Sequence, residues 1–179
     1  MSKLGNFWKT MIAGGAGVAA LAAVNAAIRR QASEPDDTAL SGDAYYFDWK
    51  YGRVFYKIAG ERNPGLPLVF VHGIGGGCSS FMWRKNFDVL AEHFKVFAVD
   101  LLGFGFSDKP SAAPYSSDLY VDLITDFIRE VCGYPVNVIA SSLGAAYAVR
   151  VADEHPELIN ALVLNAPAGG ESFRARPGM

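Results

Sequence analysis

The sequence predicts an α/β fold, with a mostly parallel sheet and helices on both faces. Short apolar runs bounded by glycine, proline or polar residues recur along the chain, as in strands that are buried on both faces. Amphipathic segments of helical length lie between these runs. Strands that alternate with such helices are joined by right-handed crossovers, which makes the strands of one sheet parallel.

The expected strands begin with a hairpin. Residues 44–49 and 53–59 are rich in aromatic and β-branched side chains and flank a turn that contains Gly52, a pattern typical of two antiparallel strands. Short apolar runs then predict four buried strands, at residues 67–73, 95–100, 136–140 and 161–165.

Three helices are expected between the later strands, at residues 81–93, 118–131 and 143–154. The second is the clearest, because its apolar residues recur at helical spacing and form one stripe. The stripe consists of Tyr120, Leu123, Ile124, Phe127, Ile128 and Val131.

Composition narrows the class of protein. The 179 residues suit about one domain, and a hydrophobic fraction of 51% is enough for a buried core. A net charge of −2 without a clustered basic face predicts no nucleic-acid binding. Cys78 and Cys132 form no C-x-x-C pair and have no histidine at zinc-ligand spacing, so we expect neither a metal site nor a cofactor.

The first thirty residues contain an uncharged run, Met11–Ile28, which is near the lower length limit for crossing a hydrocarbon core of roughly 30 Å. Because weakly apolar alanine and glycine dominate this run, three interpretations remain open: a membrane anchor, which we favour, a cleaved signal peptide, and a soluble helix. We expect a hydrophobic N-terminal segment with the start of a linker at residues 1–33, and the folded domain at residues 34–179. The anchor predicts a membrane location, whereas the alternatives predict a secreted or periplasmic protein and a cytoplasmic one.

The residues that follow the buried strands are candidates for the site, because ligands bind beyond the carboxyl ends of parallel strands. Ser142 lies between an expected strand and an expected helix, with Ala140 two residues before it and Gly144 two residues after it. Small residues at these positions allow a tight turn that exposes a nucleophilic hydroxyl. Ser141 would have bulky residues at both positions, which favours Ser142. The alternative is a serine that caps the third helix.

A glycine-rich stretch, residues 73–77, follows His72 at the end of the first buried strand. The phosphate-binding pattern G-x-x-x-x-G-K-[ST] is absent from the sequence. A loop whose backbone N–H groups approach an oxyanion fits better, because the serine elbow comes later in the chain.

Three segments, in this order, carry a family resemblance: VFVHGIGGG, VFAVDLLGFGFSDKP and VNVIASSLGAAYAV. They resemble the α/β-hydrolase superfamily, in its serine-nucleophile group related to bacterial esterases and carbon–carbon bond hydrolases. With the hairpin and the segment HPELINALVLNAPAG, the resemblance covers about residues 44–170. It implies a hydrolase that cleaves an ester or related acyl bond of a small-molecule substrate through a serine acyl-enzyme.

The resemblance also implies roles for single residues. Ser142 is the expected nucleophile, and the backbone N–H groups of Leu143 and Ile74 are the expected oxyanion hole. His72 resembles the family's loop histidine, which orders its turn and is not the catalytic base, and Asp100 belongs to a structural turn. The supporting loops would contain His72, Gly73, Gly75, Ala140 and Gly144.

Two features depart from the family pattern. Ala140 stands where glycine is commoner, and Ser141 stands where many relatives carry histidine or another larger polar residue. In addition, no histidine follows His155, although the family's acid and histidine come after the nucleophile. We therefore expect about six of the family's eight strands, no cap insertion and neither triad partner. The 179 residues alone are predicted to be nearly inactive on esters. The alternative function is a non-catalytic binding or interaction protein that retains the fold.

Overall fold

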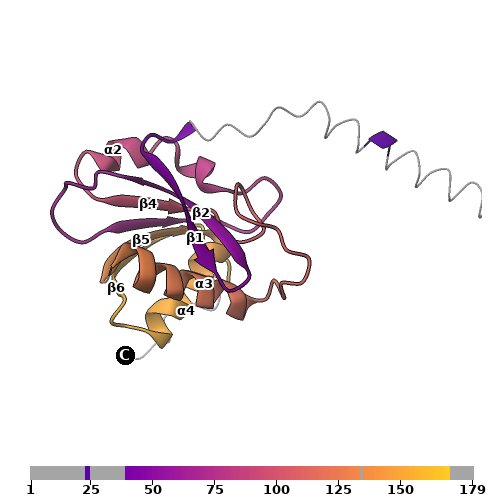
Figure 1. Ribbon diagram of the computed structural model, residues 1–179. Coiled ribbons are helices and arrows are strands. Elements are labelled where there is room, and N and C mark those ends of the chain that lie inside the picture. Colours follow the sequence, from indigo (N-terminus) through magenta and orange to yellow (C-terminus); the bar gives the residue numbers. More distant parts are fainter. Residues whose placement is uncertain (1–22, 25–38, 134, 170–179) are drawn as a thin grey trace, which may run out of the picture. The chain divides into compact units, whose positions relative to one another are not determined.

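The computed structural model describes residues 23–24, 39–133 and 135–169 (Figure 1). All but two positions of the expected N-terminal segment, residues 1–33, lie outside these residues, as do residues 34–38 of the expected domain. In the described part of the chain, no helix has the length and apolar character that a membrane crossing requires. The anchor at Met11–Ile28 and the two-part division of the chain therefore stay predictions.

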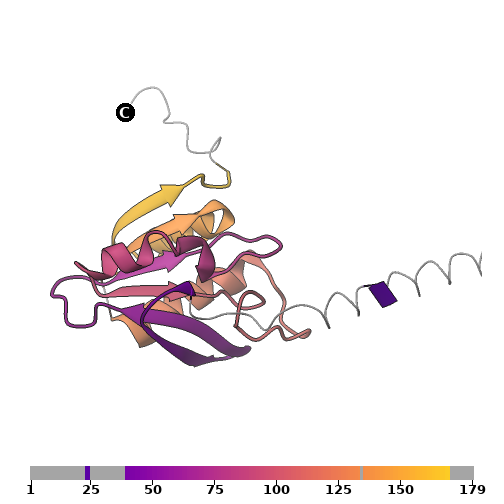
Figure 2. The ribbon, with the colours of Figure 1, turned by 90° about the horizontal axis from the view of Figure 1, so that it is seen from above.

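Six strands form one sheet in the order β1-β2-β4-β3-β5-β6. The hairpin pairs β1 with β2, and β2 also pairs antiparallel with β4. From β4 to β6 all neighbours are parallel, which confirms the predicted mostly parallel sheet. Figure 2 shows the hairpin at one edge of the sheet and β6 at the other. The strands are β1 (Asp43–Trp49), β2 (Gly52–Ala59), β3 (Leu68–Val71), β4 (Val96–Val99), β5 (Val136–Ser141) and β6 (Ile159–Asn165).

Helices cover both faces of the sheet, as predicted. α3 and α4 lie on one face and α2 lies on the other (Figure 1). Short helical turns precede α2 and follow α3, and the one after α3 is a π-helical turn that ends at Gly133, with φ of 72°. The helical elements are η2 (Ser80–Trp83), α2 (Phe87–Ala91), α3 (Ser117–Phe127), η3 (Ile128–Cys132) and α4 (Ser142–Glu154).

The expectation of one helix over residues 81–93 is wrong. The chain forms η2 and then α2, because the backbone N–H groups of Arg84 and Asn86 bond to carbonyls three residues back, which tightens the turn between them. Trp83 and Phe87 both pack against Phe70 of β3, with ring centroids 5.0 Å and 6.2 Å from that of Phe70. The apolar spacing that predicted one helix therefore does not reveal the break between η2 and α2.

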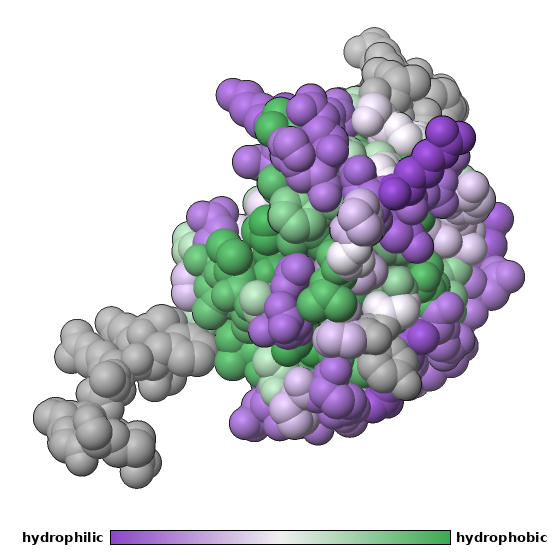
Figure 3. Space-filling model, turned by 90° about the vertical axis from the view of Figure 1, so that its left-hand side faces the viewer, coloured by the Kyte–Doolittle hydropathy of each residue, from purple (hydrophilic) through white to green (hydrophobic). Residues whose placement is uncertain are grey.

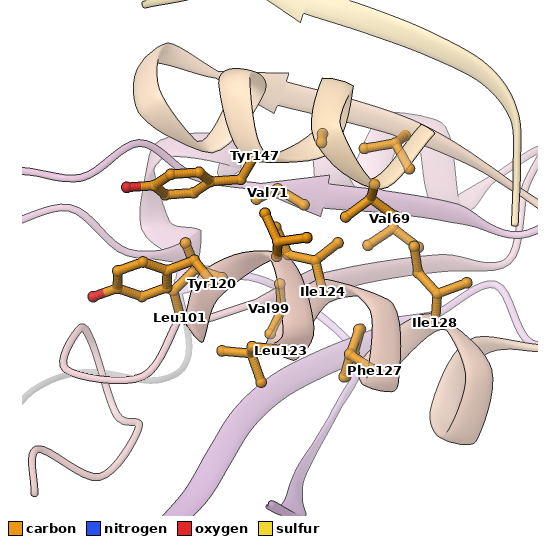
Figure 4. Close-up of a cluster of buried hydrophobic side chains, with 14 of the residues drawn as sticks. Val69, Val71, Val99, Leu101, Tyr120, Leu123, Ile124, Phe127, Ile128 and Tyr147 are labelled. Atoms are coloured by element: carbon orange, nitrogen blue, oxygen red, sulfur yellow. The ribbon is translucent and has the colours of Figure 1, made fainter. Parts of the chain in front are cut away.

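The larger core lies between the sheet and α3 and α4. Val69, Val71 and Val99 of the central strands meet Leu123 and Phe127 of α3 (Figure 4). A smaller cluster, which includes Trp83 and Phe87, lies on the face that α2 covers. Every residue of β3 and β4 is buried, so side chains on both faces of these two strands contribute to the core. Each fully buried apolar side chain of this size contributes about 1.5–3 kcal/mol.

The two edges of the sheet differ in how they are supported. At the hairpin edge, the Trp49 indole N–H donates to Asp126 of α3 at 2.8 Å, and Lys50 Nζ donates to Asp122 at 2.8 Å. At the other edge, Val163 of β6 is 58% exposed. Figure 3 shows a broad hydrophobic area on one side of the molecule. The hairpin is thus tied to the helical layer, whereas β6 keeps apolar side chains in solvent.

Candidate active site

Ser142 is the first residue of α4 and directly follows β5, at the carboxyl edge of the parallel strands. Its φ is 54°, in the left-handed region that residues other than glycine seldom occupy. Ser141, the residue before it, has extended backbone at φ of −122° and makes no side-chain capping bond to the helix. The sharp change of backbone direction at Ser142 turns the chain from the strand into the helix.

At this turn from strand to helix, which we call the elbow, the neighbouring backbone segments approach so closely that there is no room for larger side chains. A Cβ at Gly144 would lie 2.1 Å from the His72 carbonyl oxygen, and one at Gly73 would lie 2.9 Å from Ser142 Cβ. Ala140 is fully buried in β5. The start of α4 therefore packs directly on the end of β3, which brings the loop after β3 next to Ser142.

The two expected oxyanion-hole donors lie on these two segments. Leu143 N–H is in the first turn of α4, where helical N–H groups have no partner within the helix. Ile74 follows Gly73 and is half-buried against the larger core, and its N–H makes no backbone hydrogen bond among the described residues. Donors of this kind can stabilise negative charge on a carbonyl oxygen placed beside the Ser142 hydroxyl.

His72 is fully buried and holds the loop after β3 to the loop after β4. Its Nδ1–H donates to the Gly73 carbonyl at 2.6 Å, and its Nε2 accepts from the Leu101 N–H at 2.9 Å. Burial lowers the pKa of His72, so the ring stays neutral. Because both ring nitrogens are engaged, neither can accept a proton from Ser142.

Asp100 organises the turn after β4 in a similar way. Its Oδ1 accepts from the Ser80 N–H at 2.6 Å, and its Oδ2 accepts from the Phe106 N–H at 2.8 Å. A Cβ at Gly105 would collide with this carboxylate. The Ser107 hydroxyl accepts from the Phe55 N–H at 2.8 Å and donates to the Asp100 carbonyl. Both carboxylate oxygens are thus used in holding the turn.

The segment after β6 also touches the elbow, which sequence reasoning missed. Asn165 Nδ2 donates to Ser141 Oγ at 3.3 Å, and the Ala168 N–H donates to the Ser142 carbonyl at 3.0 Å. Ala166, between them, has φ of 45°. The signal that could have found the first contact is the strand register, which places Ser141 opposite Asn165.

The other two histidines lie away from this edge. His155 ends α4 at the opposite end from Ser142 and contacts Arg129, with Nδ1 and Nη2 3.3 Å apart. His93 follows α2 on the other face of the sheet. Across residues 39–133 and 135–169, no hydrogen bond joins Ser142 Oγ to a histidine ring. The same residues contain no group of three His, Cys, Asp or Glu side chains that could hold a metal ion.

A strand, a serine turn and a helix at the carboxyl edge of a mostly parallel sheet are features of α/β hydrolases. A family model described as the alpha/beta hydrolase fold matches residues 67–176. The chain belongs to this family, as the sequence motifs predicted.

This chain aligns with only part of the length of each similar protein. The 2-hydroxy-6-oxo-6-(2'-aminophenyl)hexa-2,4-dienoic acid hydrolase of Metapseudomonas resinovorans is 38% identical over 111 residues, which are 61% of this chain and 38% of that protein. The 2-hydroxymuconate semialdehyde hydrolase of a Pseudomonas species is 35% identical over 61% of this chain and 39% of its own length. A solved serine hydrolase involved in carbazole degradation matches with a TM-score of 0.65 and 32% identity, over 72% of this chain and 49% of that chain. The chain spans about two fifths of the curated relatives it matches.

Proposed function

We propose that the protein is a hydrolase in which Ser142 attacks an acyl carbonyl and forms an acyl-enzyme. The observation that carries this proposal is the conformation of Ser142, which has positive φ between β5 and α4. Such a conformation costs on the order of 1–3 kcal/mol in a residue other than glycine and is typical of functional sites. A serine that only caps a helix has extended backbone instead, so the strain supports a nucleophile over a cap.

The proposed reaction follows from the groups around Ser142. Its hydroxyl oxygen attacks the carbonyl carbon while a general base takes the hydroxyl proton, and the N–H groups of Leu143 and Ile74 bind the developing oxyanion. The protonated base gives this proton to the leaving group as the tetrahedral intermediate collapses. Water, deprotonated by the same base, then hydrolyses the acyl-enzyme, which releases the acid and restores the Ser142 hydroxyl. A group other than His72 must act as the base, because both ring nitrogens of His72 already form hydrogen bonds.

The names of the relatives support a substrate class. Two of them are named as hydrolases of an oxo-dienoic acid and of a semialdehyde, which are both small molecules with a carbonyl group. We therefore propose a small-molecule substrate whose scissile bond, an ester or an activated carbon–carbon bond, adjoins a carbonyl group.

The test is hydrolysis of p-nitrophenyl butyrate by the whole gene product that contains this chain. Ser142→Ala should lower kcat/KM by about a thousandfold or more, because the nucleophile acts as part of one unit with its base. The matched control is Ser141→Ala, which removes a neighbouring hydroxyl and should cost less than about tenfold. Labelling by a fluorophosphonate should be lost in the first variant and kept in the second.

The outcomes separate the proposal from its alternative. Turnover and labelling that survive Ser142→Ala would overturn the assignment of the nucleophile. A folded whole protein with neither turnover nor labelling would instead favour a non-catalytic binding protein that retains the fold. We also propose that the 179 residues alone hydrolyse the ester at no more than about a thousandth of the whole protein's rate, since no described histidine contacts Ser142.

We further propose that residues 1–33 form a membrane-anchoring segment with the start of a linker, ahead of a folded domain at residues 34–179. The uncharged run Met11–Ile28 supports this division. The test is carbonate extraction of membranes from cells that express the protein, with a variant lacking residues 11–28 as the control. The full protein should stay in the membrane pellet and the variant should not; equal release of both would contradict the anchor.

A further inference from the structure

A cavity of about 550 Å³ lies between the loop after β3 and the turn after β4. Neither Ser142 nor Leu143 lines it, but Ile74 and Gly75 of the loop after β3, which belong to the candidate active site, do. Its glycines are largely exposed, so the cavity opens to solvent. The side chains that line it are Ile74, Cys78, Ser79, Phe104 and Lys109.

The charge in this cavity has one sign. Lys109 Nζ donates to the carbonyls of Gly105 and Ser107, at 2.7 Å and 3.0 Å, and forms no ion pair with a carboxylate among the described residues. An ammonium group has three donors, so one remains for a ligand. The carboxylate of Asp108, next in the chain, turns to Arg53 instead, where Oδ2 accepts from the backbone N–H at 2.8 Å.

The other acidic group nearby is also satisfied. Both carboxylate oxygens of Asp100 accept backbone N–H groups, one from Ser80 of η2 and one from Phe106 in the turn, and Asp100 is fully buried. No residue from the described part of the chain that lines the cavity is acidic. The positive charge of Lys109 therefore has no protein counter-ion there.

The floor of the cavity is apolar and held in place. The Phe104 ring packs edge-on against His72, with ring centroids 5.4 Å apart, and contacts Tyr120 at 6.4 Å. Ile74 is half-buried against the same core. A rigid aromatic surface beside an unpaired cation suits a ligand that is apolar at one end and anionic at the other.

We propose that this cavity binds a small carboxylic acid with an aromatic or apolar body, the carboxylate at Lys109 and the body against Phe104 and Ile74. Occupancy would contact Ile74, whose N–H is a proposed oxyanion donor, so the ligand would touch the hydrolytic site on the side of this loop, whereas Ser142 and Leu143 do not line the cavity. The binding itself does not depend on the reaction at Ser142. It can therefore be measured whether or not the proposed hydrolysis exists.

Cys78 provides the readout, because it is a half-buried thiol in the cavity wall. Burial raises the pKa of the other thiol, Cys132, well above its usual value, so Cys132 should not react in the folded protein. The experiment measures the rate at which neutral iodoacetamide alkylates the protein in the presence of benzoate, at constant ionic strength. Cys78→Ser checks that the rate reports Cys78.

Four probes distinguish the chemistry. Benzoate should slow alkylation with saturation, and the neutral isostere benzamide should need about two- to fivefold higher concentration, as expected for one partly exposed charge pair. Benzylamine and acetate should protect least. Benzylamine carries a positive charge where benzoate carries a negative one, and acetate lacks the aromatic ring that would pack against Phe104 and Ile74. Lys109→Gln should remove the difference between benzoate and benzamide, whereas Lys109→Arg should keep it.

The matched control is Lys85→Gln, which removes an exposed lysine outside the cavity lining and should leave all four protections unchanged. Protection by benzylamine equal to that by benzoate would overturn the proposal. So would an absence of protection by any probe, or a Cys78 thiol that fails to react in the unliganded folded protein. Loss of benzoate selectivity in Lys85→Gln would also contradict it, because the selectivity would then come from general surface charge.

Discussion

The turns after β3 and β4 and the elbow after β5 hold their loops in opposite ways. The first two use buried polar side chains: His72 and Asp100 accept or donate through every polar atom of their side chains. The elbow has fewer such bonds: among the described residues, its side-chain hydrogen bond runs from Asn165 Nδ2 to Ser141 Oγ, at 3.3 Å. The elbow depends on the absence of a side chain at Gly144 and Gly73 and on a strained φ at Ser142.

This difference indicates how each region should fail. A loop held by hydrogen bonds is sensitive to the loss of an acceptor and to pH, because each buried N–H then lacks a partner. A loop held by close backbone contact is sensitive to added volume, because its neighbours are backbone atoms that cannot move aside cheaply. Three substitutions and one change of pH test this difference.

The largest effect is expected at Gly144. Gly144→Ala places a Cβ 2.1 Å from the His72 carbonyl oxygen and should lower the free energy of unfolding by about 3 kcal/mol or more. Helix propensity predicts the opposite sign, a gain of about 1 kcal/mol. Chemical denaturation measures the change, with Gly76→Ala as a control of about 0.5 kcal/mol or less, since nothing lies within 4 Å of that Cβ. A stabilised Gly144→Ala variant would show that the contact is not rigid.

A smaller loss is expected at Asp100. Asp100→Asn turns one accepting oxygen into an NH₂ group that faces a backbone N–H, so one buried donor loses its partner, at a cost of about 2–3 kcal/mol. Denaturation midpoints would report it. Asp153→Asn, an exposed carboxylate on α4, should change stability by less than about 0.5 kcal/mol. Equal effects of the two variants would remove the distinction between the buried turn and the surface.

The pH dependence should follow His72. Its pKa is lowered in the folded protein, so below about pH 6.5 the unfolded chain binds a proton that the folded protein does not. Stability should therefore be full above that pH and fall as the pH drops toward the folded value, by at most about 1.4 kcal/mol per pH unit. Denaturation at pH 7.5, 6.5 and 5.5 measures this slope. His93→Gln should keep the slope, and a flat profile in the parent protein would count against the buried neutral ring.

The smallest effect is expected at the edge of the sheet. Val163→Ala on β6 should change the stability of the 179-residue chain by less than about 0.5 kcal/mol, because the side chain is 58% exposed. The same truncation at Val69 of β3, which is fully buried, should cost about 2 kcal/mol. Thermal or chemical unfolding compares the pair directly. A similar cost at both positions would mean that Val163 is covered in solution.

Much of the fold could be read from the sequence because its signals are local. Buried strands need unbroken apolar runs, and such runs predicted β3, β4 and β5 to within a few residues. β6 begins earlier than expected, at Ile159, and the register there shifts between Val136 and Asn137. The break between η2 and α2 was not predictable, since the same apolar spacing serves one helix or two short ones.

The contacts that hold the candidate site were less readable. His72 bonds to Leu101 and Asp100 bonds to Ser80, across 29 and 20 residues of chain. In each case the partner is a backbone N–H, which nearly every residue has, so no residue type marks it. The link between Asn165 and Ser141 needs the strand register as well. The small residues around Ser142, in contrast, are visible in the sequence because the turn limits side-chain volume.

The clamp between the hairpin and α3 has a consequence for how the molecule opens. Trp49 and Lys50 are adjacent in sequence, and their partners, Asp126 and Asp122, lie one helical turn apart on α3. Local unfolding of the hairpin must therefore either detach both side chains or take the helix with it. If α3 unfolds together with the hairpin, the slowest-exchanging amide protons of β2 and α3 should share one opening free energy. The hairpin edge of the sheet and α3 would then form one cooperative unit of local unfolding.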